Sequence, residues 1–237
     1  MAAINVLEKG SYLNGGSGNS YYFGGAFTGS GTMTTALGNA FAYLTGDMTG
    51  FQGAFSHTGD SLFTWAFGNN TEAVLNDGKL FGDGVVLKAD GGTSQFKFSY
   101  TNDIILMNAI VGAEGALNAR MEQAGTGTLV LTQDNSATGT LTITCGTVQL
   151  GNGEVSGSWT GQITGAGALV VDRSAGSSAL ELNSANDYQG GTTLNGGTVK
   201  ALGTGSLGTG DVFVNGGSIL DMNGQAIANN VAITKGG

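Results

Sequence analysis

A step of about 20 residues separates two nearly identical segments in the last third of the chain. Residues 195–198 (Asn-Gly-Gly-Thr) return at 215–218 as Asn-Gly-Gly-Ser, and the glycine pair at 236–237 falls at the same phase again. A fixed period of about 20 residues is typical of a solenoid, in which one coil repeats and stacks on itself. The period therefore constrains the architecture before any other property of the chain is considered.

A second, longer sequence repeat extends this pattern. Residues 125–131 (Gly-Thr-Gly-Thr-Leu-Val-Leu) recur as 165–171 (Gly-Ala-Gly-Ala-Leu-Val-Val), and residues 182–190 have a partner at 44–53, so repeats occur in both halves of the chain. Aliphatic residues alternate with Thr and Ser in short runs bounded by Gly and Asn, which indicates half-buried strands. The sequence predicts an all-β fold, a parallel β-helix (β-solenoid) with coils of about 20 residues, roughly 12 of them, and strands on two or three faces.

The glycine and proline contents agree with such coils. The chain has 45 glycines and no proline. Sharp corners need a positive φ, which Gly and Asn adopt most easily. Proline would remove a hydrogen-bond donor from an interior strand, so its absence is expected for strands paired on both sides.

The regularity differs along the chain. We expect one continuous solenoid with an irregular N-terminal part, 1–103, and regular coils over 104–237. Within 69–100, Asp-Gly pairs that begin at Asp77, Asp83 and Asp90 mark three turns, which we interpret as hairpins or irregular coils. The best helix candidate is 114–123, and it is short.

Charge and cysteine content exclude several classes of function. The formal net charge is −9, and the eight Lys and Arg residues are scattered singly, so neither nucleic acid nor an anionic membrane is an expected partner. Cys145 is the only cysteine, so no intramolecular disulfide can form. The first residues lack the features of a secretory signal, and no apolar run approaches the ~18 residues that span a bilayer.

Residues 186–199 (Asn-Asp-Tyr-Gln-Gly-Gly-Thr-Thr-Leu-Asn-Gly-Gly-Thr-Val) resemble the autotransporter-associated β-strand repeat, or passenger-associated transport repeat. The resemblance covers 125–151 and 179–203 most directly, and roughly 104–237 as a whole. The first copy departs from the family pattern, because Ala137 replaces the tyrosine and Cys145 stands at a corner glycine. A cysteine there requires either a strained backbone or a different corner.

This resemblance implies a right-handed parallel β-helix from a bacterial passenger region that is exported across the outer membrane. In such proteins an N-terminal signal and a C-terminal β-barrel flank the passenger. We therefore expect this sequence to be an excised piece of a longer exported chain, located outside the cell or on the outer-membrane surface.

Few residues are candidates for chemistry. His57 is the only histidine, and a triad with Asp60 and Ser61 is disfavoured because the three lie too close in sequence for a rigid scaffold to position them. One His and one Cys are too few for a zinc site, and no cofactor is expected. Asp77, Asp83 and Asp90 could act as acid and base or bind Ca²⁺, although Asp-Gly is first of all a turn signal.

Aromatic residues could stack on sugar rings where they are exposed, and packing in the interior or at corners is the alternative. The candidates are Trp65, Trp159, Phe63 and the run Tyr21, Tyr22 and Phe23.

The leading functional hypothesis is a structural and adhesive module, not an enzyme. It would be an adhesin-like passenger fragment that aids export and presents a surface to host or matrix glycans and glycoproteins. The alternative is an extracellular hydrolase of glycans or mucin-like glycoproteins that uses Asp77, Asp83 or Asp90. Ice binding is not supported, because the Thr-x-Thr run at 140–144 does not recur at the coil period. Open coil ends also predict self-association.

Overall fold

A computed structural model describes residues 4–6, 11–13, 16, 18–107, 110–112, 119–135, 137–183 and 185–234. Within these ranges all regular structure is β-strand, and no helix is long and apolar enough to cross a membrane. The glycine pair at 236–237 lies outside the described residues, as do 114–118 of the expected helix. The remainder of that helix prediction is wrong, because Ala119–Gln123 forms a strand.

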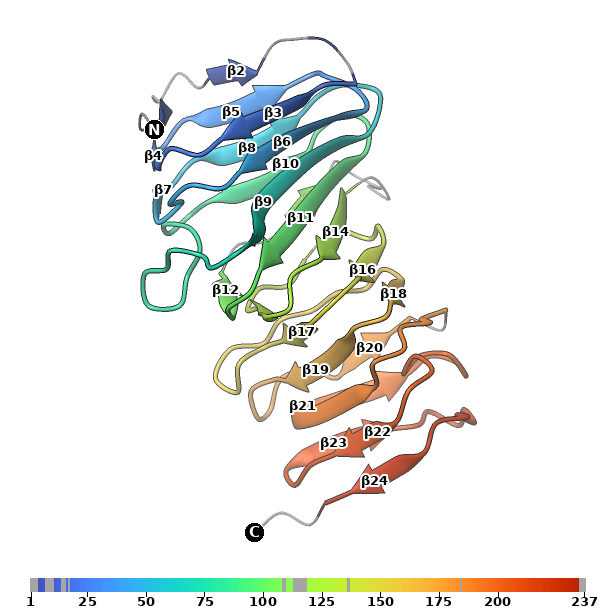
Figure 1. Cartoon of the computed structure of the whole chain (residues 1–237). Helices are drawn as coiled ribbons and strands as arrows, with labels where there is room; N and C mark the ends of the chain where they lie inside the picture. The colour runs from blue at the N-terminus through green and yellow to red at the C-terminus, as the bar shows by residue number, and fades with distance from the viewer. Residues whose placement is uncertain are drawn as a thin grey trace.

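The first three coils each consist of three short strands, so the solenoid has three faces. The strands of successive coils pair in parallel, and the coils stack from the N-terminus at the top of Figure 1 to the C-terminus at the bottom. The strands are β1 (Ile4–Val6), β2 (Ser11–Leu13), β3 (Ser20–Phe23), β4 (Phe27–Gly29), β5 (Thr32–Thr35), β6 (Ala40–Leu44), β7 (Gly50–Phe51), β8 (Ala54–His57) and β9 (Phe63–Thr71).

The later coils continue the same faces with more variable spacing. Their strands are β10 (Val86–Ala89), β11 (Ser94–Tyr100), β12 (Ile104–Leu106), β13 (Ile110–Gly112), β14 (Ala119–Gln123), β15 (Thr128–Leu131), β16 (Leu141–Ile143), β17 (Thr147–Leu150), β18 (Ile163–Gly165), β19 (Ala168–Asp172), β20 (Leu180–Leu182), β21 (Thr192–Ala201), β22 (Val212–Val214), β23 (Ser218–Asp221) and β24 (Val231–Ile233). One sheet runs in the order β18-β16-β14-β11-β9-β6-β3, and another runs in the order β12-β15-β17-β19-β21-β22-β24, with β20 and β23 also paired with β21.

The predicted parallel β-solenoid is confirmed, with longer and more variable coils than expected. It makes about nine turns with a spacing of about 22 residues. The expectation of roughly 12 coils is therefore too high. Leu129 pairs with Val148 in a short coil, whereas Phe55 pairs with Leu87 in a much longer one.

The longest coil contains the loop 72–85, which the sequence marks as irregular. Its tip is a two-residue hairpin turn, in which Asp77 and Gly78 have φ values of 50° and 78° between the bridged residues Asn76 and Lys79. Further along, the amide of Gly82 donates to the carbonyl of Phe51 at 2.9 Å. The amide of Ile105 donates to the carbonyl of Gly78 at 2.8 Å. The loop thus links the sheet that ends at β7 to the sheet that begins at β12.

The interior changes character along the axis. The N-terminal coils enclose a continuous group of rings, in which Phe55 lies 5.1 Å from Trp65 and 5.2 Å from Phe67 between ring centroids. The C-terminal coils enclose mainly aliphatic side chains, such as Leu129, Ile143 and Val171, with the rings of Trp159 and Tyr188 among them. Burial of these side chains is the main stabilising contribution, and alternate strand positions supply it.

Candidate functional site

The asparagine of the repeat motif connects three successive coils. Asn186 is 4% exposed; its Oδ1 accepts the amide of Ile163 at 2.8 Å, and its Nδ2 donates to the carbonyl of Ser206 at 2.9 Å. Asn135, at the matching position of the first copy, accepts from the amide of Ile110 and donates to the carbonyl of Ser158. The motif asparagine is therefore a structural clamp, because it pairs backbone groups that the sheets leave free.

The motif tyrosine points into the interior. Tyr188 is fully buried, its hydroxyl lies 2.6 Å from Oγ1 of Thr192, and that threonine donates to the carbonyl of Leu207. Burial raises the pKa of Tyr188, and the hydrogen bond with Thr192 opposes this in part. Ala137, which replaces the tyrosine in the first copy, is also fully buried. These residues hold the solenoid together and are not available to a ligand.

Cys145 does not strain its corner. The positive φ of 62° falls on Gly146, and Cys145 is not among the described residues with a positive φ. In the second copy Gly197 likewise carries the positive φ, of 75°, and Gly196 does not. The first position therefore carries a side chain without a positive φ in the first copy, and the positive φ falls on the second position in both copies.

The three candidate aspartates occupy turns. Asp77 forms the hairpin tip, and Asp83 pairs with Lys79 at 3.2 Å while its side chain is 83% exposed. Asp90 accepts a hydrogen bond from Oγ of Ser56 at 2.7 Å. Asp83 precedes β10 and Asp90 follows it, so a four-residue strand that spans about 13 Å separates them.

His57 is a buried residue at the end of β8, not an exposed loop residue. Its Nδ1 lies 3.2 Å from the carbonyl oxygen of Thr35, and its Nε2 lies 2.7 Å from that of Ser61. Both ring nitrogens thus face backbone carbonyls, and neither faces a hydroxyl nucleophile. Among the described residues, no group of three or more His, Cys, Asp or Glu side chains could hold a metal ion.

One polar hollow surrounds a buried cation. A space of about 290 Å³ is lined by residues that include Asp134, Arg173 and Glu181. Burial lowers the pKa of Arg173, and Asp134 raises it. The guanidinium donates to the carbonyls of Gly157 at 2.5 Å and Ser178 at 3.3 Å, so its main role is to tie two loops together.

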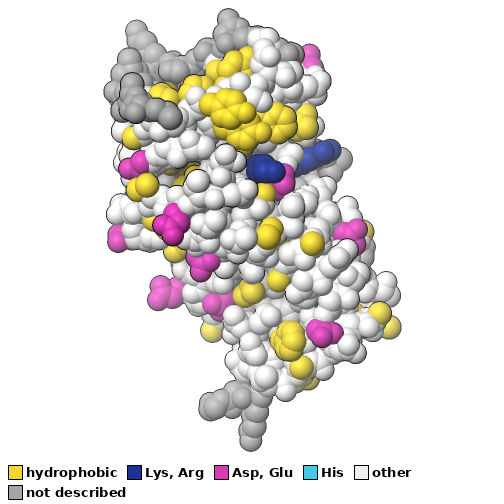
Figure 2. Space-filling view, in the orientation of Figure 1, with side chains coloured by type: hydrophobic (Ala, Val, Ile, Leu, Met, Phe, Trp, Pro, Cys, Tyr) yellow, Lys and Arg dark blue, Asp and Glu magenta, His cyan; other side chains and the backbone are white. Residues whose placement is uncertain are grey.

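Of the aromatic candidates, Tyr22 is the one that is exposed. Trp65, Trp159 and Phe63 are fully buried, whereas Tyr22 is 74% exposed on β3. Its ring stacks on Tyr43 of β6, with centroids 4.9 Å apart and planes within 7°, and Tyr43 stacks on Phe41 at 5.9 Å. Tyr22, Phe41 and Tyr43 are called the aromatic array below. Figure 2 shows hydrophobic side chains gathered over this N-terminal part of the molecule.

The sequence analysis did not identify Phe41 and Tyr43 as candidate surface aromatics, although their spacing and alternation indicate that they are. Tyr22 and Tyr43 are one coil apart along the chain, and the strand register places them side by side. Alternation along β6 also places Phe41 and Tyr43 on the outer side, because Ala40, Ala42 and Leu44 are buried.

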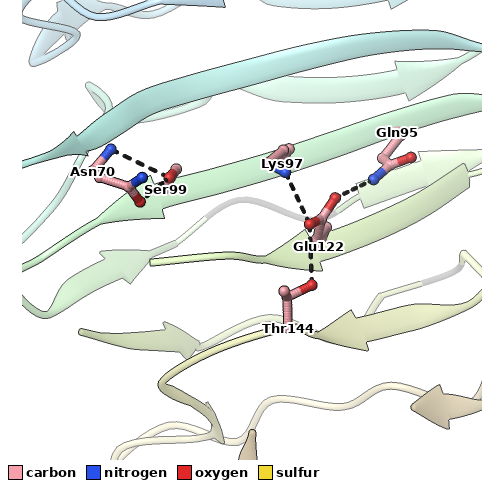
Figure 3. Close-up of polar contacts among 6 residues, drawn as sticks. All are labelled: Asn70, Gln95, Lys97, Ser99, Glu122 and Thr144. Atoms are coloured by element: carbon pink, nitrogen blue, oxygen red, sulfur yellow. Dashed lines mark hydrogen bonds and ion pairs between the residues drawn. The ribbon is translucent and has the colours of Figure 1, made fainter. Parts of the chain in front are cut away.

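A polar group lies on the same face, two and three strands from β6. Glu122 of β14 accepts from Nζ of Lys97 at 2.9 Å, from Nε2 of Gln95 at 2.5 Å and from Oγ1 of Thr144 at 3.1 Å (Figure 3). Arg120, the register partner of Gln95, is exposed and forms no ion pair within the described part of the chain. The face therefore combines exposed rings with hydrogen-bonding groups and a cation that has no acidic partner among the described residues.

These features define a class: an all-β, parallel β-solenoid whose conspicuous surface is an aromatic and polar sheet face. Comparison with known families adds a narrower statement. Residues 121–150 and 175–201 both match the family model described as passenger-associated-transport-repeat. The resemblance to this repeat family is confirmed, and it supports an exported, surface-associated protein with a role linked to autotransporter passengers. No curated protein and no solved structure matches the chain.

Proposed function

We propose that this chain is a structural and adhesive passenger module of a bacterial autotransporter-like protein. It extends outward from the cell or is released from it, and it presents a binding surface to host or matrix glycoproteins. The aromatic array carries this proposal, since large exposed ring surfaces on a rigid scaffold are typical of interaction sites. The outer-membrane surface or the extracellular medium is the proposed location.

The solenoid also suits a role during export. Each strand pairs with a strand of the neighbouring coil, so a coil can form as soon as the preceding coil is in place. The two passenger-associated transport repeats contribute the asparagine clamps described above. We propose that they help the passenger to fold coil by coil beside the flanking barrel of the full-length protein.

Binding of the purified chain to immobilised glycoproteins tests the adhesive role. We expect saturable binding to mucin-type or matrix glycoproteins, and loss of that binding after enzymatic removal of their glycans. The same samples should release no new reducing ends. Failure to bind any glycoprotein would contradict the adhesive proposal. Release of sugars that is abolished in Asp77→Asn, Asp83→Asn or Asp90→Asn would support the hydrolase in place of the adhesive module. The positions of these aspartates give no specific support to that activity.

A further inference from the structure

The polar hollow around Arg173 spans three successive coils. Strands β15, β17 and β19 stack in parallel, and the hollow is lined by residues that follow each of them: Asp134 after β15, Ser158 and Thr160 after β17, and Arg173 and Glu181 after β19. Asp134 and Ser158 are bridged partners in neighbouring coils. The volume of about 290 Å³ is close to the lower limit of about 300 Å³ for small-molecule pockets, so the hollow has room for a small ligand.

The rim of the hollow carries polar groups that the protein itself does not use. Asp134 is exposed, and its carboxylate accepts no hydrogen bond from the described residues. The hydroxyl groups of Ser158 and Thr160 also form no hydrogen bond within the described part of the chain. A carboxylate accepts through two oxygens, whereas a hydroxyl both donates and accepts. The rim can therefore satisfy several hydroxyl groups of a ligand at once.

The floor of the hollow combines a buried cation with an aliphatic side chain. Arg173 and Leu180 line it and are only 5% and 3% exposed. A guanidinium has five N–H donors. In Arg173 these groups form two bonds, to the carbonyls of Gly157 and Ser178, and Nε has no partner among the described residues. The guanidinium therefore retains donors for an oxygen atom of a ligand, and Leu180 offers a contact for C–H groups.

The charges around the hollow nearly cancel. Asp134 and Glu181 contribute two carboxylates, and Arg173 contributes one guanidinium. Nζ of Lys200 also pairs with Glu181 at 2.7 Å. An anionic ligand would meet the two carboxylates, whereas a cationic ligand would meet Arg173, and either would bring an uncompensated charge. Among the described residues, no group of three or more His, Cys, Asp or Glu side chains could hold a metal ion. The balance favours a neutral ligand that is rich in hydroxyl groups.

We infer that this hollow binds a neutral pyranose unit of an oligosaccharide. Two adjacent hydroxyl groups of the sugar donate to the carboxylate of Asp134, and others exchange hydrogen bonds with Ser158 and Thr160. An oxygen of the sugar accepts from Arg173, and its C–H groups pack on Leu180. The site shares no residue with the aromatic array, and it does not depend on the adhesive function proposed above.

Calorimetric titration of the whole chain at pH 6 tests the assignment. The neutral probes are cellobiose and lactose, and the charged comparison ligands are digalacturonate and the glucosamine dimer. We expect at least one neutral disaccharide to bind saturably and more tightly than both charged disaccharides. The reason is that only a neutral sugar uses the free acceptors and donors without adding a charge to the hollow.

Two variants test the residues of the rim. Asp134→Ala should weaken binding of the neutral disaccharide at least about tenfold, because it removes a charged acceptor. Thr160→Val keeps the volume of the side chain and removes its hydroxyl, so it should weaken binding about threefold. Neither side chain forms a hydrogen bond within the described residues, so both variants should keep the fold, as circular dichroism can verify.

Two matched variants control for loss of a carboxylate or a hydroxyl elsewhere. Asp60→Ala removes an exposed aspartate between β8 and β9, and Thr126→Val removes an exposed hydroxyl just before β15. Neither residue lines the hollow, so both variants should bind the neutral disaccharide like the original chain.

Three results would overturn the assignment. Absence of binding of both cellobiose and lactose would remove the sugar site, and tighter binding of either charged disaccharide would remove the assignment of a neutral ligand. Unchanged binding by Asp134→Ala would show that the sugar lies elsewhere on the chain. Glycoproteins do not enter this titration, so a failure of the adhesive function would be seen separately.

Discussion

Two buried tyrosines differ in what their hydroxyl groups meet. The hydroxyl of Tyr188 has Thr192 as a partner, whereas that of Tyr100 has no hydrogen-bond partner among the described residues. Burial raises the pKa of both side chains. A buried hydroxyl without a partner lowers stability relative to a hydrogen atom at the same position.

Tyr100→Phe should therefore stabilise the chain by about 1 kcal/mol, whereas Tyr188→Phe should destabilise it by a similar amount. Chemical denaturation at neutral pH measures both free energies of unfolding. A loss of stability in Tyr100→Phe as large as that in Tyr188→Phe would contradict the different environments of the two hydroxyls.

The same residues predict a pH dependence. A tyrosine whose pKa is raised on folding holds its proton more tightly in the folded state than in the unfolded state, so its contribution is complete below the unfolded pKa of about 10. That contribution is lost as the pH rises above about 10. We expect the midpoint of urea unfolding to fall between about pH 9 and 11, and to fall less in Tyr100→Phe; a flat profile would contradict this.

The side chain of Asn186 links backbone groups of the two neighbouring coils. Asn186→Ala would leave the amide of Ile163 and the carbonyl of Ser206 buried without partners, at a cost of about 2–4 kcal/mol. Asn230→Ala, at an exposed position that bonds to Asp211, should change stability by less than about 0.5 kcal/mol. Thermal and urea unfolding would show whether the two variants differ in this way.

At the scale of strands and corners, the two residues of the glycine-pair position differ in backbone conformation. Gly146 has a positive φ, and a Cβ there would collide with the carbonyl oxygen of Gly127, whereas Cys145 already carries a side chain without strain. Gly146→Ala should cost about 1–3 kcal/mol and Cys145→Ser should be nearly neutral. Similar unfolding midpoints for the two variants would show that the corner does not depend on the positive φ.

The strands and turns of the regular coils could be predicted from sequence because local patterns determine them. The Asp-Gly at 77–78 forms the turn that its residues favour. The 20-residue step of the Asn-Gly-Gly motif places Asn215 beside Asn195, and Nδ2 of Asn215 donates to Oδ1 of Asn195 at 2.7 Å. The coil lengths could not be predicted in the same way. The register depends on which residue of one coil meets which residue of the next, as in the long step from Phe55 to Leu87.

The aromatic array depends on the same long-range register. Tyr22, Phe41 and Tyr43 gather only when β3 and β6 pair in one register. A pattern of alternation places each ring inside or outside, but not beside a particular neighbour. Sequence reasoning could therefore identify Tyr22 as a candidate without identifying the site.

For the whole molecule, the most C-terminal coils carry an apolar hollow. A hollow of about 550 Å³ there is lined mainly by aliphatic side chains, and Ile219 and Ile233 are 58% and 79% exposed. We propose that two copies associate through this end.

Sedimentation velocity over a range of concentrations should show reversible association of the chain. Ile219→Lys together with Ile233→Lys should shift the distribution to monomer, because the charges would have to be buried in the contact. Phe41→Lys, on a different face, is the control and should associate normally. A chain that stays monomeric at the highest concentration would contradict end-to-end association.

The hairpin tip at Asp77 and Gly78 has a further consequence for design. The loop that carries it is anchored on both sides of the tip: the amide of Ala73 donates to Oδ1 of Asn102 at 2.8 Å, and Phe81 packs against Phe67 at 5.1 Å between ring centroids. The side chain of Asp77 at the tip is exposed. A peptide grafted between the two tip residues would project from the side of a rigid rod and leave these two anchors of the loop in place. The scaffold could thus display foreign epitopes at one fixed height along its axis.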